Sequence, residues 1–438
     1  MGCHFDRSGA DGEISPNRWS LEFQTFRGGE ISPAGEMIFP ILLILQTCNR
    51  PAIELPFLLK NGTMTVLNSM RYSNVCIEAF TCCLPEEIVS TELLEKRCEP
   101  LYRRLHLPEG RLEALTGIKE RRIWESGKTP GQQSILTVQK LLEQTGFDPN
   151  RIGALIHGSV CRDYLEPATA CSVHRALNFP PTSFVYDISN ACLGIVSGMI
   201  QIADMIELGH IEAGIVVGTE SSRSLMETTI QHLNTDLSLT RKSVKSAFAS
   251  LTIGSGSAAV LLAHRNISRT GNRLLGGAVH AETKFCDLCR SDTDQSGGDT
   301  MSPLMQTDSE TLMKEGIAAA AQCFERFLTE TGWTRVDIDR TFCHQVGRAH
   351  QKLLFETLNI PPELNFSTLE YLGNTGSAAL PTAAAIGIAT SSVPNDSQLA
   401  LLGIGSGINV IMLGIDWHRT LPTGQQSRAT IKVAENFQ

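Results

Sequence analysis

Apolar residues in this chain form short continuous runs that alternate with longer stretches of helical spacing. From residue 70 onward, the short runs predict strands and the amphipathic stretches between them predict helices. Strands are predicted over residues 152–158, 183–188, 213–218 and 258–263, and helices over residues 168–177 and 193–208. Strands and helices that alternate at this spacing are typical of βαβ units, so we expect a mainly parallel sheet.

The second part of the chain repeats the same pattern. It predicts a helix over residues 311–331, a strand over 338–343, helices after His344 and after Asn374, and a strand over 398–402. The repetition indicates a duplication of one α/β unit. We divide the chain into a first half at residues 70–268, a second half at 269–417 and a C-terminal tail at 418–438.

Residues 1–69 differ from the rest because they are rich in Gly, Pro, Ser and Arg. They contain one apolar run, residues 38–45, which Pro40 interrupts. This run is too short to span a bilayer, so no stable membrane insertion is predicted. We expect residues 1–69 to be a disordered extension or a mis-assigned upstream start.

Overall composition is that of an ordinary globular enzyme. The 438 residues include 46 acidic and 37 basic side chains, and the net charge of −9 argues against a nucleic-acid partner. The 13 cysteines are odd in number and scattered, unlike a disulfide framework, and they favour a reducing cytoplasm. Cys286 and Cys289 have CxxC spacing, but no second pair follows, so no metal site is predicted.

Cys192 is the first candidate for chemistry. The strand predicted at residues 183–188 leads into Asn190-Ala191-Cys192, and small residues then open an apolar helix. Unpaired N–H groups and the positive end of a helix dipole favour the thiolate and can hold an oxyanion. The alternative is a buried, inert cysteine, which is common for this residue type.

Two other segments place polar side chains at similar turns. His344 follows the strand predicted at residues 338–343, and Asn374 lies between Gly373 and Gly376 before an Ala-rich helix. A single histidine is usually structural, and a single asparagine between glycines usually forms a turn. Three such turns, in the order Cys, His, Asn, make a purely structural explanation much weaker.

With these motifs the chain resembles the thiolase superfamily, and within it the ketosynthase III branch. The resemblance covers about residues 70–417, and the run Thr-Gly-Ile-Lys-Glu-Arg-Arg at 116–122 is similar to that branch's N-terminal signature. Residues 159–170, Ser-Val-Cys-Arg-Asp-Tyr-Leu-Glu-Pro-Ala-Thr-Ala, are similar to the bacterial enzymes that begin olefin synthesis by joining two acyl-CoA molecules head to head.

The resemblance implies a duplicated five-layer αβαβα fold with the helices after the catalytic turns in its central layer. It also implies that Cys192 carries the acyl group, while His344 and Asn374 activate it and stabilise an enolate. The N–H groups of Cys192 and Ser406 would form the oxyanion hole, Ser406 lying in a glycine-rich turn between two predicted strands.

The condensation needs a carbanion at the α-carbon of the second thioester, and the role of Glu166 distinguishes two ways to form it. Its apolar neighbours favour a desolvated carboxylate that removes an α-proton, whereas ordinary ketosynthase III enzymes decarboxylate a malonyl group and need no base. The resemblance implies that this glutamate enters the partner's active site, and hence a homodimer. The alternative is a carboxylate that favours the start of the helix after Pro167.

We therefore expect a non-decarboxylative acyltransferase that joins two fatty acyl-CoA thioesters and needs no cofactor besides these substrates. The alternatives are a decarboxylative ketosynthase III that uses a malonyl carrier protein, and a non-catalytic thiolase-fold partner subunit. Residues 221–250 and 281–310 are polar and irregular and are expected to flank the pocket. Arginine on phosphate and tryptophan near adenine are expected to hold CoA, with surface salt bridges as the alternative, at Arg121, Arg122, Trp124 and Arg348.

Overall fold

The computed structural model describes residues 69–291, 304–344, 346–390 and 393–421, together with the backbone of five short strands between residues 24 and 66. The chain divides into two units, Met1–Ser69 and Met70–Gln438. The first unit contains an antiparallel sheet, although no strand was predicted there from the sequence. The sheet comprises β1 (Gln24–Thr25), β2 (Glu30–Ile31), β3 (Met37–Leu43), β4 (Ile53–Lys60) and β5 (Thr63–Val66). The disorder expected for the remaining residues of 1–69 falls outside the described part of the chain.

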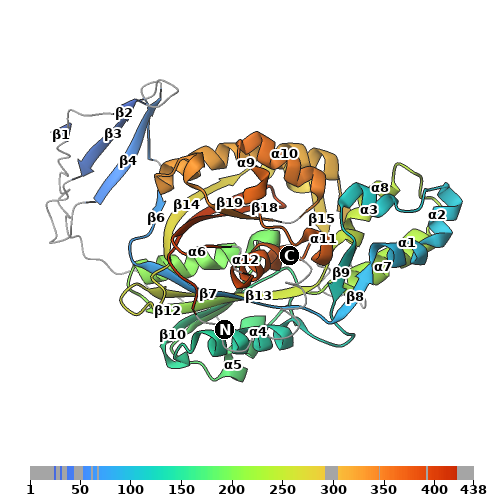
Figure 1. The fold of residues 1–438 in the computed structure, drawn as a ribbon, viewed down its shortest axis with the longest axis horizontal. Coiled ribbons are helices and arrows are strands. Elements are labelled where there is room, and N and C mark those ends of the chain that lie inside the picture. Colours follow the sequence, from blue (N-terminus) through green and yellow to red (C-terminus); the bar gives the residue numbers. More distant parts are fainter. Residues whose placement is uncertain are drawn as a thin grey trace, which may run out of the picture. The chain divides into compact units, whose positions relative to one another are not determined.

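The second unit is built on two sets of strands (Figure 1). The first set follows the order β11 (Phe184–Ile188), β10 (Ile152–Gly158), β12 (Ala213–Glu220), β13 (Gly256–His264) and β7 (Val75–Cys83). The second set follows the order β14 (Arg273–Ala281), β19 (Asn409–Trp417), β18 (Ser397–Gly405) and β17 (Arg340–Cys343), with β6 (Met70–Arg71) on β14. One residue pair, Cys76 with Arg273, links the two sets.

The expectation of a mainly parallel sheet is wrong. Parallel pairing occurs between β10 and β11, β10 and β12, and β17 and β18. The other pairs of this sheet are antiparallel, including the hairpin in which β18 and β19 are joined by the short turn that contains Ser406. A turn of this length can join only antiparallel neighbours, and the apolar runs alone carry no strand direction.

Helices cover both faces of each set of strands. The helices outside the first set are α4 (Pro130–Thr145) and α5 (Thr169–Leu177), those between the sets are α6 (Gly194–Glu207) and α12 (Ala379–Ala389), and those outside the second set are α9 (Ser309–Thr331) and α10 (Arg348–Leu358) (Figure 1). This order of layers confirms the predicted five-layer αβαβα fold.

Alternating strand residues divide the apolar core between the layers. In β18, Leu399 and Leu401 belong to the central core with α6 and α12, whereas Ala400 and Leu402 pack with α9 and α10. Successive strand side chains point to opposite faces, so a strand covered on both sides must be apolar throughout. Helix α12, which is buried from Ala379 to Ile388, is accordingly apolar on every side except at Thr382.

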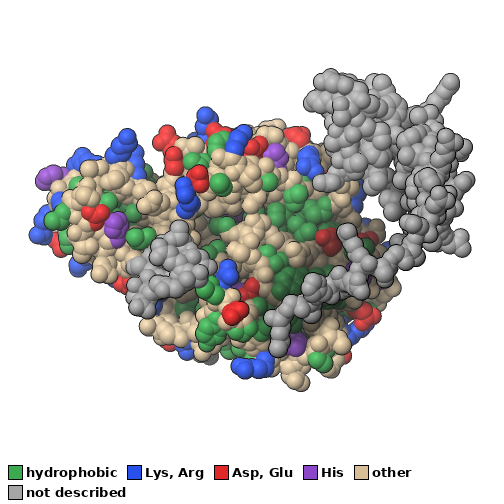
Figure 2. Space-filling model, turned by 180° about the vertical axis from the view of Figure 1, so that it is seen from behind, with side chains coloured by type: hydrophobic (Ala, Val, Ile, Leu, Met, Phe, Trp, Pro, Cys, Tyr) green, Lys and Arg blue, Asp and Glu red, His purple; other side chains and the backbone are tan. Residues whose placement is uncertain are grey.

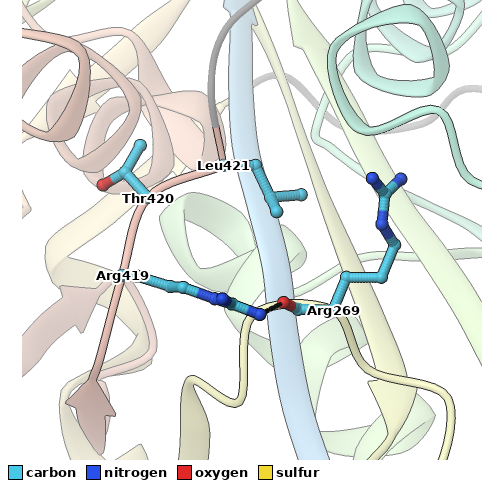
Figure 3. A pocket seen from close by; sticks show the side chains of 4 residues that line it. All are labelled: Arg269, Arg419, Thr420 and Leu421. Carbon is cyan, nitrogen blue, oxygen red and sulfur yellow. Dashed lines mark hydrogen bonds between the residues drawn. The ribbon is translucent and has the colours of Figure 1, made fainter.

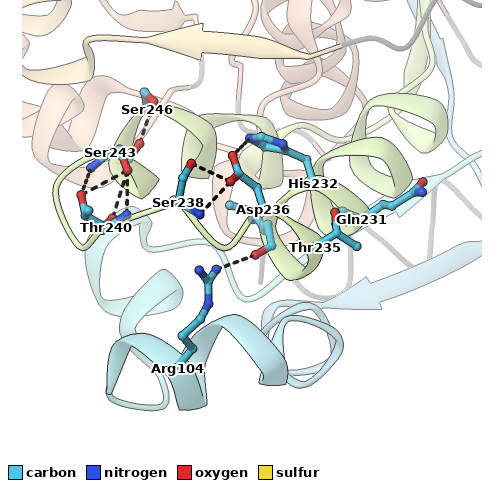
Figure 4. A network of polar contacts seen from close by, with 10 residues as sticks. Arg104, Gln231, His232, Thr235, Asp236, Ser238, Thr240, Ser243 and Ser246 are labelled. Atoms are coloured by element: carbon cyan, nitrogen blue, oxygen red, sulfur yellow. Dashed lines mark hydrogen bonds and ion pairs between the residues drawn. The ribbon is translucent and has the colours of Figure 1, made fainter.

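A separate lobe with its own apolar core lies beside the layers (Figure 1). It contains α1 (Thr91–Arg97), α2 (Glu99–Leu105), α3 (Arg111–Thr116), α7 (Arg223–Thr235), α8 (Val244–Phe248), and the strands β8 (Glu87–Ser90) and β9 (Glu120–Ile123). The expectation of irregular structure over residues 221–250 is therefore wrong. In the loop after α7, Asp236 accepts hydrogen bonds from the N–H and hydroxyl groups of Ser238 (Figure 4).

The remaining elements are short. They are α11 (Leu369–Leu372), β15 (Cys289–Ser291), β16 (Met305–Thr307) and the 3-10 helices η1 (Pro149–Arg151), η2 (Ala191–Leu193), η3 (Ala249–Thr252), η4 (Thr283–Leu288), η5 (Arg335–Asp337), η6 (Pro362–Leu364) and η7 (Gly376–Ala378). Of the segment expected to be irregular at 281–310, residues 292–303 fall outside the described part of the chain. Among the described helices, none combines the length and apolarity that a bilayer crossing demands.

Candidate active site

Cys192 lies at a sharp turn between β11 and α6, as the sequence predicted. Strand β11 ends at Ile188, the 3-10 turn η2 contains the cysteine, and α6 begins two residues later. Ala191 has a φ of 43°, a left-handed conformation that non-glycine residues rarely adopt. Such backbone strain persists only where the surroundings enforce it, and it is concentrated at functional sites.

Neighbouring polar groups and a close backbone contact hold this turn. The amide of Asn190 donates to the Ser197 hydroxyl at 2.9 Å and its oxygen accepts from Asn409 at 3.0 Å. A Cβ atom on Gly194 would lie 2.7 Å from the carbonyl carbon of Gly158, so only glycine lets α6 start this close to β10.

The thiol of Cys192 is uncharged, contrary to the expected thiolate. Burial, followed by the charge of Glu220, raises the pKa of Cys192 to about 12, and the thiol's own backbone N–H opposes this only weakly. The local N–H group that we expected to favour the thiolate is present, but the apolar surroundings outweigh it.

His344 also lies at a strand end. It follows β17 directly, its N–H group donates to the Leu402 carbonyl of β18 at 3.1 Å, and it is 7% exposed. Burial, with a smaller contribution from His350, lowers the pKa of His344 to about 3, so the imidazole is neutral at physiological pH. Its Nδ1 atom has no hydrogen-bond partner among the described residues.

Asn374 lies in a loop that is fastened to the first half of the chain. Its N–H donates to the Thr252 carbonyl at 3.0 Å, and its own carbonyl accepts from the Gly254 N–H at 2.9 Å. The side-chain oxygen accepts from the Gly376 N–H at 3.0 Å, which leaves the NH₂ group as the available donor. Asn374 is 8% exposed.

The hairpin that contains Ser406 approaches the cysteine turn. A Cβ atom on Gly405 would lie 3.7 Å from the Cys192 nitrogen, so the residue before Ser406 packs on that turn. The 3-10 turn η2 also packs against η7, which follows Asn374. The structure therefore brings the turns of Cys192, Asn374 and Ser406 together, with His344 bonded to the strand that ends in this hairpin.

Glu166 is exposed in the loop before α5. The alternative role predicted for Glu166 was a carboxylate that stabilises the start of α5, but Asp187 occupies that position. The carboxylate of Asp187 accepts from the N–H groups of Thr169 and Ala170 at 2.7 and 2.9 Å. Glu166 therefore does not cap α5 in the single chain.

Three residues expected to contact CoA lie inside the fold. Arg121 is 0% exposed, and its guanidinium donates to the Thr91 hydroxyl at 3.0 Å. Arg122 and Trp124 are buried and donate to the backbone carbonyls of Pro85 and Glu220. Burial of these side chains removes the surface that a coenzyme phosphate or adenine would need. In contrast, the Arg348 side chain is 70% exposed and lies 3.7 Å from the carboxylate of Glu370.

Glu220, the last residue of β12, was not predicted as a site residue. Glu220 is 5% exposed and accepts hydrogen bonds from the loop that precedes Glu166 and from the segment that follows Asn374. Its only signal in the sequence is a single acid at the end of an apolar strand, which many surface strands share.

Other surface features lie apart from these turns. A pocket lined by Arg269, Arg419, Thr420 and Leu421 follows the far end of β13, where Arg419 donates to the Arg269 carbonyl (Figure 3). On the face drawn in Figure 2, the described acidic and basic side chains are interspersed, and apolar side chains form patches near the centre. Among the described residues, no three His, Cys, Asp or Glu side chains gather as metal ligands.

Comparison with known proteins agrees with this geometry. The family model of the thiolase N-terminal domain matches residues 132–272, and that of the 3-oxoacyl-[acyl-carrier-protein] synthase III C-terminal domain matches residues 328–417. The acyl-CoA:acyl-CoA alkyltransferase of Shewanella oneidensis is 40% identical over 80% of this chain and 100% of its own length. The enzyme of the same name from Xanthomonas campestris is 30% identical over 80% and 100% of the two chains.

Solved structures show the same relationship. A crystal structure of OleA from Xanthomonas campestris with bound lauric acid and lauroyl-CoA has a TM-score of 0.74 at 29% identity, covering 79% of this chain and 100% of that one. A 3-oxoacyl-(acyl carrier protein) synthase III from Xanthomonas oryzae has a TM-score of 0.75 at 30% identity, covering 80% and 100%.

Proposed function

The chain belongs to the acyl-CoA:acyl-CoA alkyltransferase family of the thiolase superfamily, and on this premise we propose that it condenses two fatty acyl-CoA thioesters head to head. The observation that carries the proposal is 40% identity to such an enzyme over that enzyme's whole length, with a cysteine at the turn before a central helix. Acyltransferase activity needs that nucleophile, which a non-catalytic partner subunit would not require.

The reaction proceeds in two steps. First, the Cys192 sulfur attacks the carbonyl carbon of one acyl-CoA; the carbon–sulfur bond to CoA breaks, and CoA leaves as its thiol. His344 takes the proton of Cys192 in this step and passes it to the sulfur of the departing CoA. Both side chains are uncharged before the step. The N–H groups of Cys192 and Ser406 stabilise the oxyanion.

In the second step, Glu166 removes an α-proton from the second acyl-CoA. The resulting carbanion attacks the acyl carbon on Cys192, the bond to sulfur breaks, and a β-ketoacyl-CoA leaves. Glu166 gives up the proton that it removed and the Cys192 sulfur takes up one proton, which restores the carboxylate and the thiol. His344 and the NH₂ group of Asn374 donate to the carbonyl oxygen of the enolate, which carries the developing charge. No carbon dioxide is released by this route.

Glu166 acts in the site of a second copy of the chain, so the enzyme is a homodimer. The exposed segment that carries Glu166 also exposes Tyr164 and Leu165, at 63% and 57%. Strand β11 lies at the edge of its sheet, where Phe184 is 49% exposed. Exposed apolar residues beside an unpaired strand edge are typical of a protein–protein interface. A partner subunit bound there would also bury Glu166 and remove water from its carboxylate.

Among the residues considered for CoA, Arg348 alone presents its charge at the surface, so we assign it a phosphate contact. We place the enzyme in the cytoplasm, because the described cysteines are free thiols, which a reducing compartment preserves.

Incubation with two fatty acyl-CoAs and no malonyl donor tests the proposed reaction. A β-ketoacyl product, without carbon dioxide, supports it. Strict dependence on a malonyl thioester would instead indicate the decarboxylative reaction. The match of residues 328–417 to the synthase III C-terminal domain is the observation that favours this alternative.

A further inference from the structure

Glu220 joins two segments that the reaction needs. One carboxylate oxygen accepts from the Val160 N–H at 3.1 Å and from both the N–H, at 3.2 Å, and the hydroxyl of Ser377. The other oxygen accepts from the Cys161 N–H at 3.3 Å. We call this set of contacts the Glu220 bridge.

Each side of the Glu220 bridge leads to a functional residue. Val160 and Cys161 lie after β10 in the loop that continues to Glu166, and Ser377 lies in η7, three residues after Asn374. The intervening Gly376 has a φ of 55°, and a Cβ atom there would lie 3.0 Å from the Cγ atom of Glu220. The backbone of this loop is therefore shaped around the Glu220 side chain.

We propose that Glu220 is a positioning residue that holds the Asn374 segment and the Glu166 segment in one arrangement. The inference rests on the proposed function, in which Asn374 serves its own subunit and Glu166 serves the partner's site. Each Glu220 bridge would then connect the two active sites of the dimer. Protein donors reach both oxygens of Glu220, so we assign it a positioning role.

The substitution Glu220→Gln tests the hydrogen bonds of the Glu220 bridge. All the groups that face the carboxylate donate, and a glutamine would direct an NH₂ group at one of them. With the amide oxygen toward Val160 and Ser377, the NH₂ group meets the Cys161 N–H, and that bond is lost. The substitution keeps the size of the side chain and disturbs the relative placement of the two segments.

A buried carboxylate away from the site provides a matched control. Glu78 of β7 is 2% exposed and accepts from the Arg269 N–H at 3.0 Å and from the hydroxyls of Ser268 and Thr270. Glu78→Gln removes a comparable set of contacts, but none of these donors belongs to a loop that carries a site residue. Its thermal midpoint should fall by a similar amount to that of Glu220→Gln.

The experiment compares the two variants by single-turnover acylation of Cys192, by steady-state condensation of two acyl-CoAs and by thermal melting. Glu220→Gln should lower kcat for condensation by about tenfold to a hundredfold, with a small change in KM and a smaller effect on acylation, because misplacement of a catalytic group by about 1 Å has this cost. Glu78→Gln should keep the wild-type kcat. Equal rates in the two variants would overturn the proposal.

Purified heterodimers test the connection between the sites. Paired with a Cys192→Ala subunit, a Glu220→Gln subunit has one working site, in which its own Asn374 segment is disturbed. Paired with wild type, a subunit carrying both Glu220→Gln and Cys192→Ala instead supplies a disturbed Glu166 segment to an intact cysteine. Both heterodimers should be slower than the matched heterodimers with intact Glu220, and a wild-type rate in either would reject the connection.

Two further measurements cover the cases in which Glu220→Gln does not fold or the enzyme requires a malonyl thioester. If Glu220→Gln does not fold, Ser377→Ala removes only the hydroxyl contact and should lower kcat in the same direction, and a wild-type kcat would overturn the role of the bridge. If the wild-type enzyme requires malonyl thioester, the proposed function fails, while the comparison of Glu220→Gln with Glu78→Gln is still read on that reaction.

Discussion

The turn that carries Cys192 and the turn that carries Asn374 lead into neighbouring central helices, but different contacts hold them. Asn190, just before Cys192, donates to Ser197 of the following helix and accepts from Asn409 of the second half, so this turn has one local side-chain bond and one from the other half. The Asn374 loop bonds to Thr252, Gly254 and Glu220, which all lie in the first half of the chain. The turn of the nucleophile is therefore held by both halves of the duplicated fold, whereas the backbone of Asn374 bonds to the half to which it does not belong.

The two turns also differ in what burial does to their chemistry. Burial raises the pKa of Cys192 and lowers the pKa of His344, so neither is charged before substrate arrives. Asn374 does not titrate and supplies the same donors at every pH. The cysteine and the histidine therefore begin the reaction uncharged, while the buried carboxylate of Glu220 contributes to the raised pKa of Cys192.

Removal of the nucleophile should have the largest effect. Cys192→Ala should abolish both covalent acylation and condensation, because it removes the thiol at the turn before α6. Mass spectrometry of the peptide that contains residue 192 checks the acyl group. Cys171→Ala, at an exposed thiol, is the control and should behave as wild type. An acyl-enzyme formed by Cys192→Ala would end the assignment.

Glu166→Gln should separate the two steps. Acylation of Cys192 should be nearly intact, while condensation should fall by about 10²- to 10⁴-fold, the usual contribution of a positioned base. A mixture with Cys192→Ala subunits should recover part of the activity, because one site of the heterodimer then has both groups. Product analysis with paired acyl-CoAs measures this. Wild-type condensation by Glu166→Gln would refute the role of the carboxylate.

Asn374→Ala tests the second turn directly. Loss of the NH₂ donor should lower condensation by about 10²- to 10³-fold, as for other oxyanion donors. The backbone bonds to Thr252 and Gly254 remain, so the thermal midpoint should change little. A large loss of stability with little loss of kcat would show that Asn374 is a structural turn residue.

A pair of glycine substitutions tests how closely the Cys192 turn is packed. Gly194→Ala places a methyl group against the Gly158 backbone and should lower the free energy of unfolding by about 1–3 kcal/mol. Gly316→Ala in α9 meets nothing closer than 3.4 Å, and the better helix propensity of alanine should leave stability unchanged or slightly raised. Chemical denaturation compares them, and equal effects would contradict the packing argument.

The smallest effect concerns pH. A neutral His344, with its pKa lowered to about 3, and a neutral Cys192, with its pKa raised to about 12, both keep their protonation state across the neutral range. The single-turnover rate of acylation should therefore be flat between about pH 6 and pH 9. A preformed thiolate with an ordinary pKa would instead make the rate rise about tenfold per unit below that pKa.

Local sequence determined the parts of this protein that depend on neighbours along the chain. The run of apolar residues over β10 and the turn at Cys192 were predicted because periodicity and small residues act within a few positions. Only the tertiary structure decided the strand directions, the burial of Arg121 and the contacts of Glu220. These features depend on residues that are far apart in the chain, such as Glu220 and Ser377. When such residues pack together and exclude solvent, burial determines which polar groups need a hydrogen-bond partner and which ionisable groups stay charged.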